Sequence, residues 1–135
     1  MGGTSKLDVM PHKFALSNAA VGATLEDIEN PRVIDGRYNK VCFELENTHA
    51  TVALTDFSLM VRAHEDGTFV NLITGAGWQA AVGAILLFKT ANIDTLAATA
   101  KATLLVNVAG WQAIKFQAKT GTSGSVTVRG YFSRS

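Results

Sequence analysis

The stretch "TDFSLMVRAHEDGTFVNLIT", from Thr55 to Thr74, decides the fold. In its first half Phe57, Leu59 and Val61 alternate with other residues, and this period of two is typical of a half-buried strand. A second β-rich run, TFVNLIT, follows directly after Glu65-Asp66-Gly67. Asp-Gly between two such runs is a strong short-range hairpin signal. The stretch therefore predicts two antiparallel strands, with Asp66 and Gly67 supplying positive φ at the turn.

The same turn contains the one local cluster that invites a chemical interpretation. His64, Glu65 and Asp66 could form a metal site or an acid–base pair, but either site needs further partners at a defined spacing. The histidines His12, His49 and His64 are scattered, and Cys42 is the only cysteine. None of them forms a metal-binding motif. We expect a solvent-exposed turn, no enzymatic activity, no catalytic residue, no metal and no cofactor.

Outward from this hairpin, other runs alternate in the same way and are separated by short turn-forming segments. They include VCFELEN at 41–47, ATLLVNV at 102–108, AIKFQAK at 113–119 and SVTVRGYFS at 125–133. The segment 92–102 is expected to be a loop, with a short helix as the alternative. The pattern predicts an all-β fold, a single β-sandwich over residues 13–135 with either immunoglobulin-like or jelly-roll strand order. An extended N-terminal arm over residues 1–12 would precede it.

Composition limits the classes of partner. The 135 residues fit one domain, and a net charge of +1 provides no basic field for nucleic acid. The most apolar run, Ala80 to Phe88, is too short to cross a membrane and is expected in the core. Charged residues form only 17% of the chain and hydrophobic residues 47%. This balance predicts that part of the surface is buried in an oligomer or a larger assembly.

One apolar motif resembles a dinucleotide-binding fingerprint. Gly75, Gly77 and Ala80 match G-x-G-x-x-A, and Asp94 follows at a plausible distance for a ribose contact. The motif lacks the long helix of a βαβ unit, and the bulky Trp78 stands where backbone would have to approach pyrophosphate. We interpret it as a glycine-rich loop.

The tetrapeptide GWQA occurs twice and contains both tryptophans, Trp78 and Trp111. Indoles at strand starts usually pack over the edge of a core, but exposed ones anchor protein interfaces or stack on sugars. The interface candidates are therefore these two tryptophans and three apolar residues of the arm: Trp78, Trp111, Leu7, Val9 and Met10.

Taken in order, "FELENTHATVALTDFSLMVRAHEDGTFVNLI" and "LLVNVAGWQAIKFQAKTGTSGSVTVRGYFS" resemble small β-sandwich structural proteins of tailed bacteriophages. The resemblance implies a virion component without catalytic activity, made in the host cytoplasm, such as a capsid decoration or cement protein. It would form a homo-oligomer, for example a trimer, and would bind the major capsid protein or another virion protein. It would have no nucleic-acid or membrane partner. The alternative is a carbohydrate-binding β-sandwich module that uses exposed tryptophans.

Overall fold

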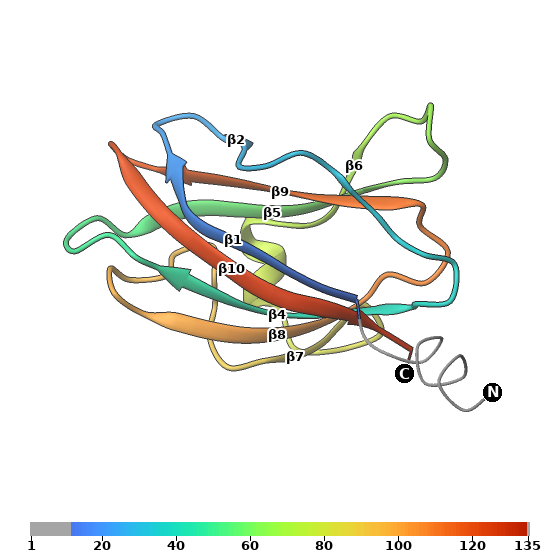
Figure 1. Cartoon of the computed structure of the whole chain (residues 1–135). Coiled ribbons are helices and arrows are strands. Elements are labelled where there is room, and N and C mark those ends of the chain that lie inside the picture. Colours follow the sequence, from blue (N-terminus) through green and yellow to red (C-terminus); the bar gives the residue numbers. More distant parts are fainter. Residues whose placement is uncertain (1–11, 135) are drawn as a thin grey trace.

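The computed structural model describes residues 12–134, which form two antiparallel sheets packed face to face (Figure 1). The strands are β1 (His12–Val21), β2 (Glu26–Asp27), β3 (Arg32–Val33), β4 (Lys40–Asn47), β5 (Leu54–Arg62), β6 (Val70–Thr74), β7 (Leu86–Lys89), β8 (Lys101–Asn107), β9 (Ala113–Thr120) and β10 (Gly124–Ser133). One 3₁₀ helix, η1 (Gly75–Gln79), follows β6. The predicted all-β sandwich is confirmed, and β1 includes His12.

The order of strands is that of a jelly roll. The first sheet runs β1-β10-β4-β8-β7, and the second runs β2-β9-β5-β6 with β3 also paired to β9. When β2 and β3 are counted as one strand and β7 as an addition, eight strands remain. The first then pairs with the eighth, the second with the seventh, the third with the sixth and the fourth with the fifth. This nested antiparallel pairing defines a jelly roll and selects one of the two predicted strand orders.

The alternating sequence pattern places the core between the sheets. In β4, for example, Val41, Phe43 and Leu45 are buried while the residues between them are half-buried. The centre of the core is aromatic: the ring of Phe116 lies 5.1 Å from that of Phe43 and 5.7 Å from that of Phe57. Close-packed aromatic pairs of this kind contribute more than their buried area alone. The two sheets are therefore held together by side chains from both.

The turn between β5 and β6 is longer than predicted. The strands are separated by residues 63–69, and the N–H of Gly67 donates to the carbonyl oxygen of His64 over 2.8 Å. Positive φ occurs within residues 12–134 at Asn18, Thr99 and two glycines, but not at Asp66 or Gly67. Gly67 is the fourth residue of its turn, where type I turns favour glycine without needing positive φ. The expectation of positive φ was wrong, although the hairpin itself is present.

The apolar run from Ala80 to Phe88 is not core, contrary to the sequence prediction. Val82 is 52% exposed, Ile85 45% and Phe88 51%, whereas Leu86 is buried. The run passes from η1 to β7 and so connects the edge strands of the two sheets. Because it crosses the open side of the sandwich, only part of it has a layer to pack against. The loop predicted at 92–102 contains no helix, and β8 starts at its end, at Lys101.

Candidate interface surfaces

The polar turn at His64 does not bring potential metal ligands or acid–base partners together within residues 12–134. His64, Glu65 and Asp66 are all exposed, and the Nδ1 atom of His64 accepts a hydrogen bond from the backbone of Asp66 at 3.3 Å. Among residues 12–134 no group of three or more potential metal ligands is found. The turn is what the sequence predicted, a solvated connection between two strands.

Trp78 is a core residue, so its assignment as an interface or sugar-stacking residue was wrong. It is fully buried in η1, and its Nε1–H donates to the carbonyl oxygen of Phe57 over 2.7 Å. Its ring meets that of Phe43 edge-on, with centroids 6.5 Å apart. The short helix turns the indole inward across the open side of the sandwich. An indole enclosed in this way cannot contact a partner or a glycan.

Trp111 lies in the turn between β8 and β9 and is half-buried against the core. Its backbone N–H donates to the carbonyl oxygen of Val108 over 3.2 Å. The neighbouring Gln112 accepts a hydrogen bond from Nε of Arg62 at 2.7 Å, which ties this turn to β5. Trp111 is thus no free-standing platform. The other interface candidates, Leu7, Val9 and Met10, lie outside the described residues.

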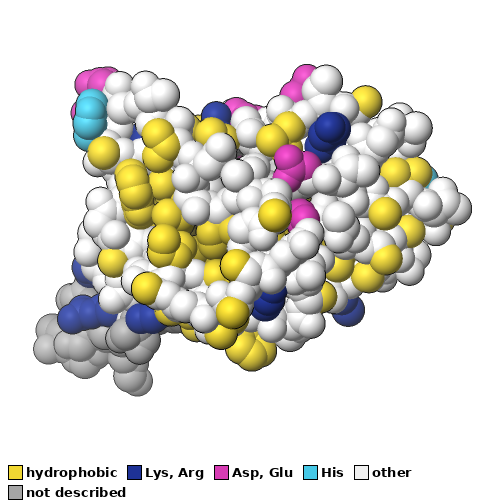
Figure 2. Space-filling view, turned by 180° about the vertical axis from the view of Figure 1, so that it is seen from behind, with side chains coloured by type: hydrophobic (Ala, Val, Ile, Leu, Met, Phe, Trp, Pro, Cys, Tyr) yellow, Lys and Arg dark blue, Asp and Glu magenta, His cyan; other side chains and the backbone are white. Residues whose placement is uncertain are grey.

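A groove lies beside the exposed apolar run, on the open side of the sandwich. We call it the edge groove, because β6 is an edge strand of one sheet and β7 an edge strand of the other. Its volume is about 470 Å³. It is lined by Asn71, Leu72, Ile73, Thr74, Gly77, Ala80, Ala81, Gly83, Ala84, Ile85 and Leu86. Figure 2, the view from behind, shows hydrophobic side chains gathered on this side of the molecule, with few charges among them.

The edge groove combines two features that favour association. Its lining contains no charged side chain. Around it Val70, Val82 and Ile85 each expose nearly half of their surface or more. An edge strand also presents backbone groups that can pair with another strand, and native proteins normally protect such edges with charge. An apolar, uncharged edge is therefore suited to a protein partner.

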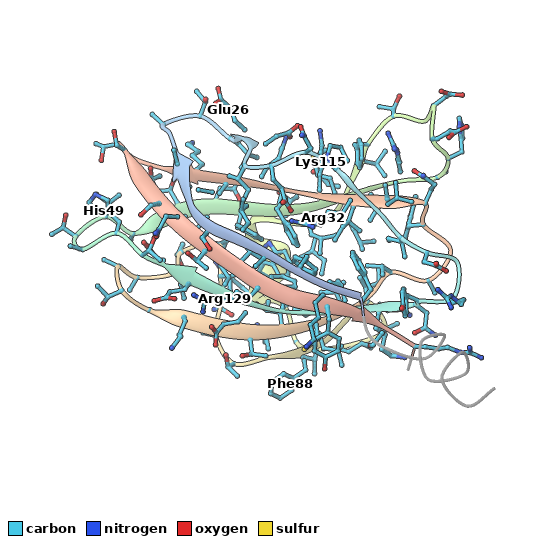
Figure 3. All side chains as sticks on the ribbon, viewed as in Figure 1. Glu26, Arg32, His49, Phe88, Lys115 and Arg129 are labelled. Atoms are coloured by element: carbon cyan, nitrogen blue, oxygen red, sulfur yellow. The ribbon has the colours of Figure 1, made fainter. Side chains whose placement is uncertain are left out.

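A second apolar surface crosses the outer face of the first sheet. Tyr131 of β10 pairs with Cys42 of β4, Cys42 pairs with Leu105 of β8, and Leu105 pairs with Phe88 of β7. We call these four residues the aromatic row. Tyr131 is 39% and Phe88 51% exposed, and the two residues between them are half-buried. Figure 3 shows Phe88 pointing away from the body of the protein at the end of this row.

A hollow of about 680 Å³ opens next to the aromatic row. Its lining includes a polar pair, with Nη1 of Arg129 and Oε1 of Glu44 3.9 Å apart. The hollow is lined by Lys13, Phe14, Ala15, Cys42, Phe43, Glu44, Thr103, Arg129, Gly130 and Tyr131. The period-two alternation of the runs 41–47 and 102–108 places Cys42 and Leu105 opposite the buried residues of their strands. It does not align the two residues with each other, because alignment depends on the register between distant strands.

The outer face of the second sheet is polar by contrast. Asp27 of β2 accepts hydrogen bonds from Nε2 of Gln117 at 2.7 Å and from Nζ of Lys115 at 3.2 Å. Partial burial raises the pKa of Asp27, but these two hydrogen bonds and the charge of Lys115 outweigh it and lower the pKa overall. Nζ of Lys115 also lies 4.7 Å from the centre of the Phe69 ring. These contacts tie β2 and the β5–β6 loop to the sheet.

Comparisons with known proteins bear on the fold. No protein-family model matches the chain, and no curated protein sequence matches it. The crystal structure of SPBc2 prophage-derived protein YomS is similar, with a TM-score of 0.53 over 92% of this chain and 95% of that one. The two sequences are 15% identical, so the likeness is one of fold. Within residues 12–134 no helix is long and apolar enough to span a membrane.

Proposed function

We propose that this protein is a non-enzymatic structural component of a tailed-phage virion, a decoration or cement protein that self-associates and binds capsid subunits. It would be made in the host cytoplasm and retained in the particle. The likeness in fold to a prophage-derived protein supports the phage setting. The resemblance of the two long sequence stretches to phage β-sandwich proteins supports the same setting.

The observation that carries the proposal is the edge groove with its exposed, uncharged rim. Val70, Val82 and Ile85 lie on the side where both sheets end. Leaving an apolar surface of this kind in water is unfavourable. Each Å² of apolar surface removed from water contributes about 25 cal/mol of favourable free energy. Pairing copies of the chain through this side would bury these side chains and cover the free edge of β6. Self-association is therefore the activity that the geometry favours.

The test measures native mass by light scattering over a range of concentrations, for the wild type and for Val82→Lys. We expect a wild-type oligomer and a variant shifted toward the monomer, because a lysine at this position would have to lose its water on association. The matched control is Val33→Lys. Val33 is 57% exposed on β3, which pairs at the edge of the second sheet opposite to β6. Its substitution should leave the mass unchanged.

A wild type that stays monomeric at every concentration would overturn self-association in solution, and equal effects of the two lysines would remove the edge groove from the proposal. Attachment to the particle is tested separately, by cosedimentation with heads purified from the phage that encodes the chain. We expect saturable binding to heads. Failure of the wild type to cosediment would overturn the decoration role whatever its oligomeric state.

A further inference from the structure

The aromatic row is an apolar stripe without a covering layer among residues 12–134. Its two ends, Tyr131 and Phe88, are the kind of aromatic side chains that dominate interfaces. Cys42 and Leu105 complete it, and the adjoining hollow could receive a further apolar side chain. The outer face of this sheet is polar around the row, with Arg129 beside Glu44. The aromatic row is thus a narrow apolar strip and not a broad apolar face.

The strand to which the N-terminal segment is joined lies at one end of the aromatic row. β1 lies at the edge of the sheet next to β10, His12 pairs with Phe132, and Lys13 pairs with Tyr131. His12, to which residues 1–11 are joined, therefore lies close to the first member of the row. Residues 1–11 contain "KLDVMP", in which Leu7 and Val9 alternate with Asp8. In an extended chain those two apolar side chains would share one face, with Asp8 toward water.

The lengths match. Neighbouring strands lie about 4.8 Å apart, so Cys42 is about 10 Å and Leu105 about 14 Å across the sheet from β1. An extended chain advances about 3.3 Å per residue, which puts Val9 about 10 Å and Leu7 about 16 Å from His12. A segment that turns at Pro11 and runs across the sheet would bring Val9 near Cys42 and Leu7 near Leu105.

We propose that the chain's own N-terminal segment is the occupant of the aromatic row, with Leu7 and Val9 packed along it. The segment is tethered at the end of the row, so its effective concentration there is far above that of any free partner. The docking is independent of the edge groove and does not rest on the proposed function. It would cover the apolar stripe and limit access to the Cys42 thiol.

The sole cysteine makes the test direct. In the full chain, Val9→Cys is oxidised with copper phenanthroline, and disulfide formation with Cys42 is followed by non-reducing electrophoresis and intact mass. The matched control is Asp8→Cys, one position away and directed to the other side. We expect the Val9→Cys disulfide to form at least about tenfold faster, which corresponds to a preference of about 1.4 kcal/mol.

A disulfide inside one chain supports the proposal, whereas a disulfide that forms only between two chains would overturn docking of the segment on its own molecule. Equal rates for Val9→Cys and Asp8→Cys would overturn the proposal. As a second measurement, Leu7→Glu combined with Val9→Glu should raise the reaction rate of Cys42 with Ellman's reagent severalfold, while circular dichroism shows that the β-sandwich remains folded. An unchanged thiol rate would also overturn the proposal.

Discussion

At the scale of single residues, the two GWQA copies show how far a local sequence can be interpreted. The sequence identifies Trp78 and Trp111 as candidate interface residues. For each of them it allows either packing in the core or exposure at the surface. It cannot show that Trp78 belongs to a 3₁₀ turn that places the indole between the sheets, because that direction depends on β6 and β7 lying at the same side. The burial of Trp78 comes from tertiary structure, and no local motif encodes it.

Replacement of Trp78 should be severe. Trp78→Ala would remove a fully buried ring and leave the carbonyl of Phe57 without its indole donor. We expect a loss of about 3–5 kcal/mol in the free energy of unfolding, measured by urea denaturation followed by circular dichroism. Trp111→Ala serves as the control and should cost clearly less, because that ring is half-buried. Equal losses would contradict the assignment of Trp78 to the core.

Asp27 should contribute a small, pH-dependent stability. Its pKa is lower in the folded protein than the ordinary value of 3.8, so its contribution is present above that value and is lost as pH falls through the folded pKa. The Asp27 side chain is 44% exposed, and exposed ion pairs contribute at most about 1 kcal/mol. We expect Asp27→Asn to be slightly less stable than wild type at pH 7. The difference should shrink as the pH falls below 3.8 and the wild-type carboxyl becomes protonated in the folded protein as well.

The check on Asp27 is a pair of urea titrations at each pH. A difference that persists unchanged at the lowest pH would show that the contacts of Asp27 act through shape rather than charge.

At the scale of elements, period-two alternation predicted the buried faces of β4, β8, β9 and β10. It worked there because each of these strands has one side in the core. The prediction for Ala80–Phe88 was wrong, because it inferred burial from apolar content alone. This run connects the edge strands of the two sheets, and only part of it packs against the core. Neither the edge groove nor the aromatic row could be predicted, because both depend on which strands become neighbours.

The approach of β10 to β4 requires a glycine at position 130. A Cβ built there would lie 2.2 Å from the carbonyl oxygen of Cys42 and 2.8 Å from Cα of Phe43. Both atoms are held by the strand, so Gly130→Ala must push β10 away from β4. We expect a loss of about 1–3 kcal/mol or more, as in other overpacked sites, with the urea midpoint as the measurement.

The matched control is Gly36→Ala, since a Cβ there would meet nothing within 4 Å and its φ is not in the left-handed region. This substitution should be neutral or stabilise by about 0.4–1 kcal/mol through the unfolded chain. Tolerance of alanine at position 130 would mean that the two strands are less tightly apposed than described.

At the scale of the whole molecule, the jelly roll is held by pairings between parts of the chain that are far apart in sequence. β1 pairs with β10, and β4 pairs with both β10 and β8. Alternation in the sequence predicts most of the long strands and their buried faces, and hence the sandwich. It leaves the strand order open between two candidates, because a hairpin signal determines only adjacent strands.

Such pairings should make folding slow. The chain loses loop-closure entropy before contacts between distant strands can stabilise it. We therefore expect refolding in milliseconds to seconds, as in other β-sandwiches. Stopped-flow dilution from urea, followed by tryptophan fluorescence, measures it through the buried Trp78. Refolding within microseconds would contradict a transition state that depends on distant strands.

The pairing of β1 with β10 also determines when the protein can be completed on the ribosome. β1 begins at His12 and β10 at Gly124, so β1 lacks the strand with which it pairs within residues 12–134 while about a hundred residues are translated. At about 5–20 residues per second this interval is on the order of ten seconds. During it the inner side of β1, including Phe14, stays available to chaperones and to other nascent chains. Translation on a polysome, where many such nascent chains lie close together, is therefore the stage at which β1 is most exposed to mispairing with another chain.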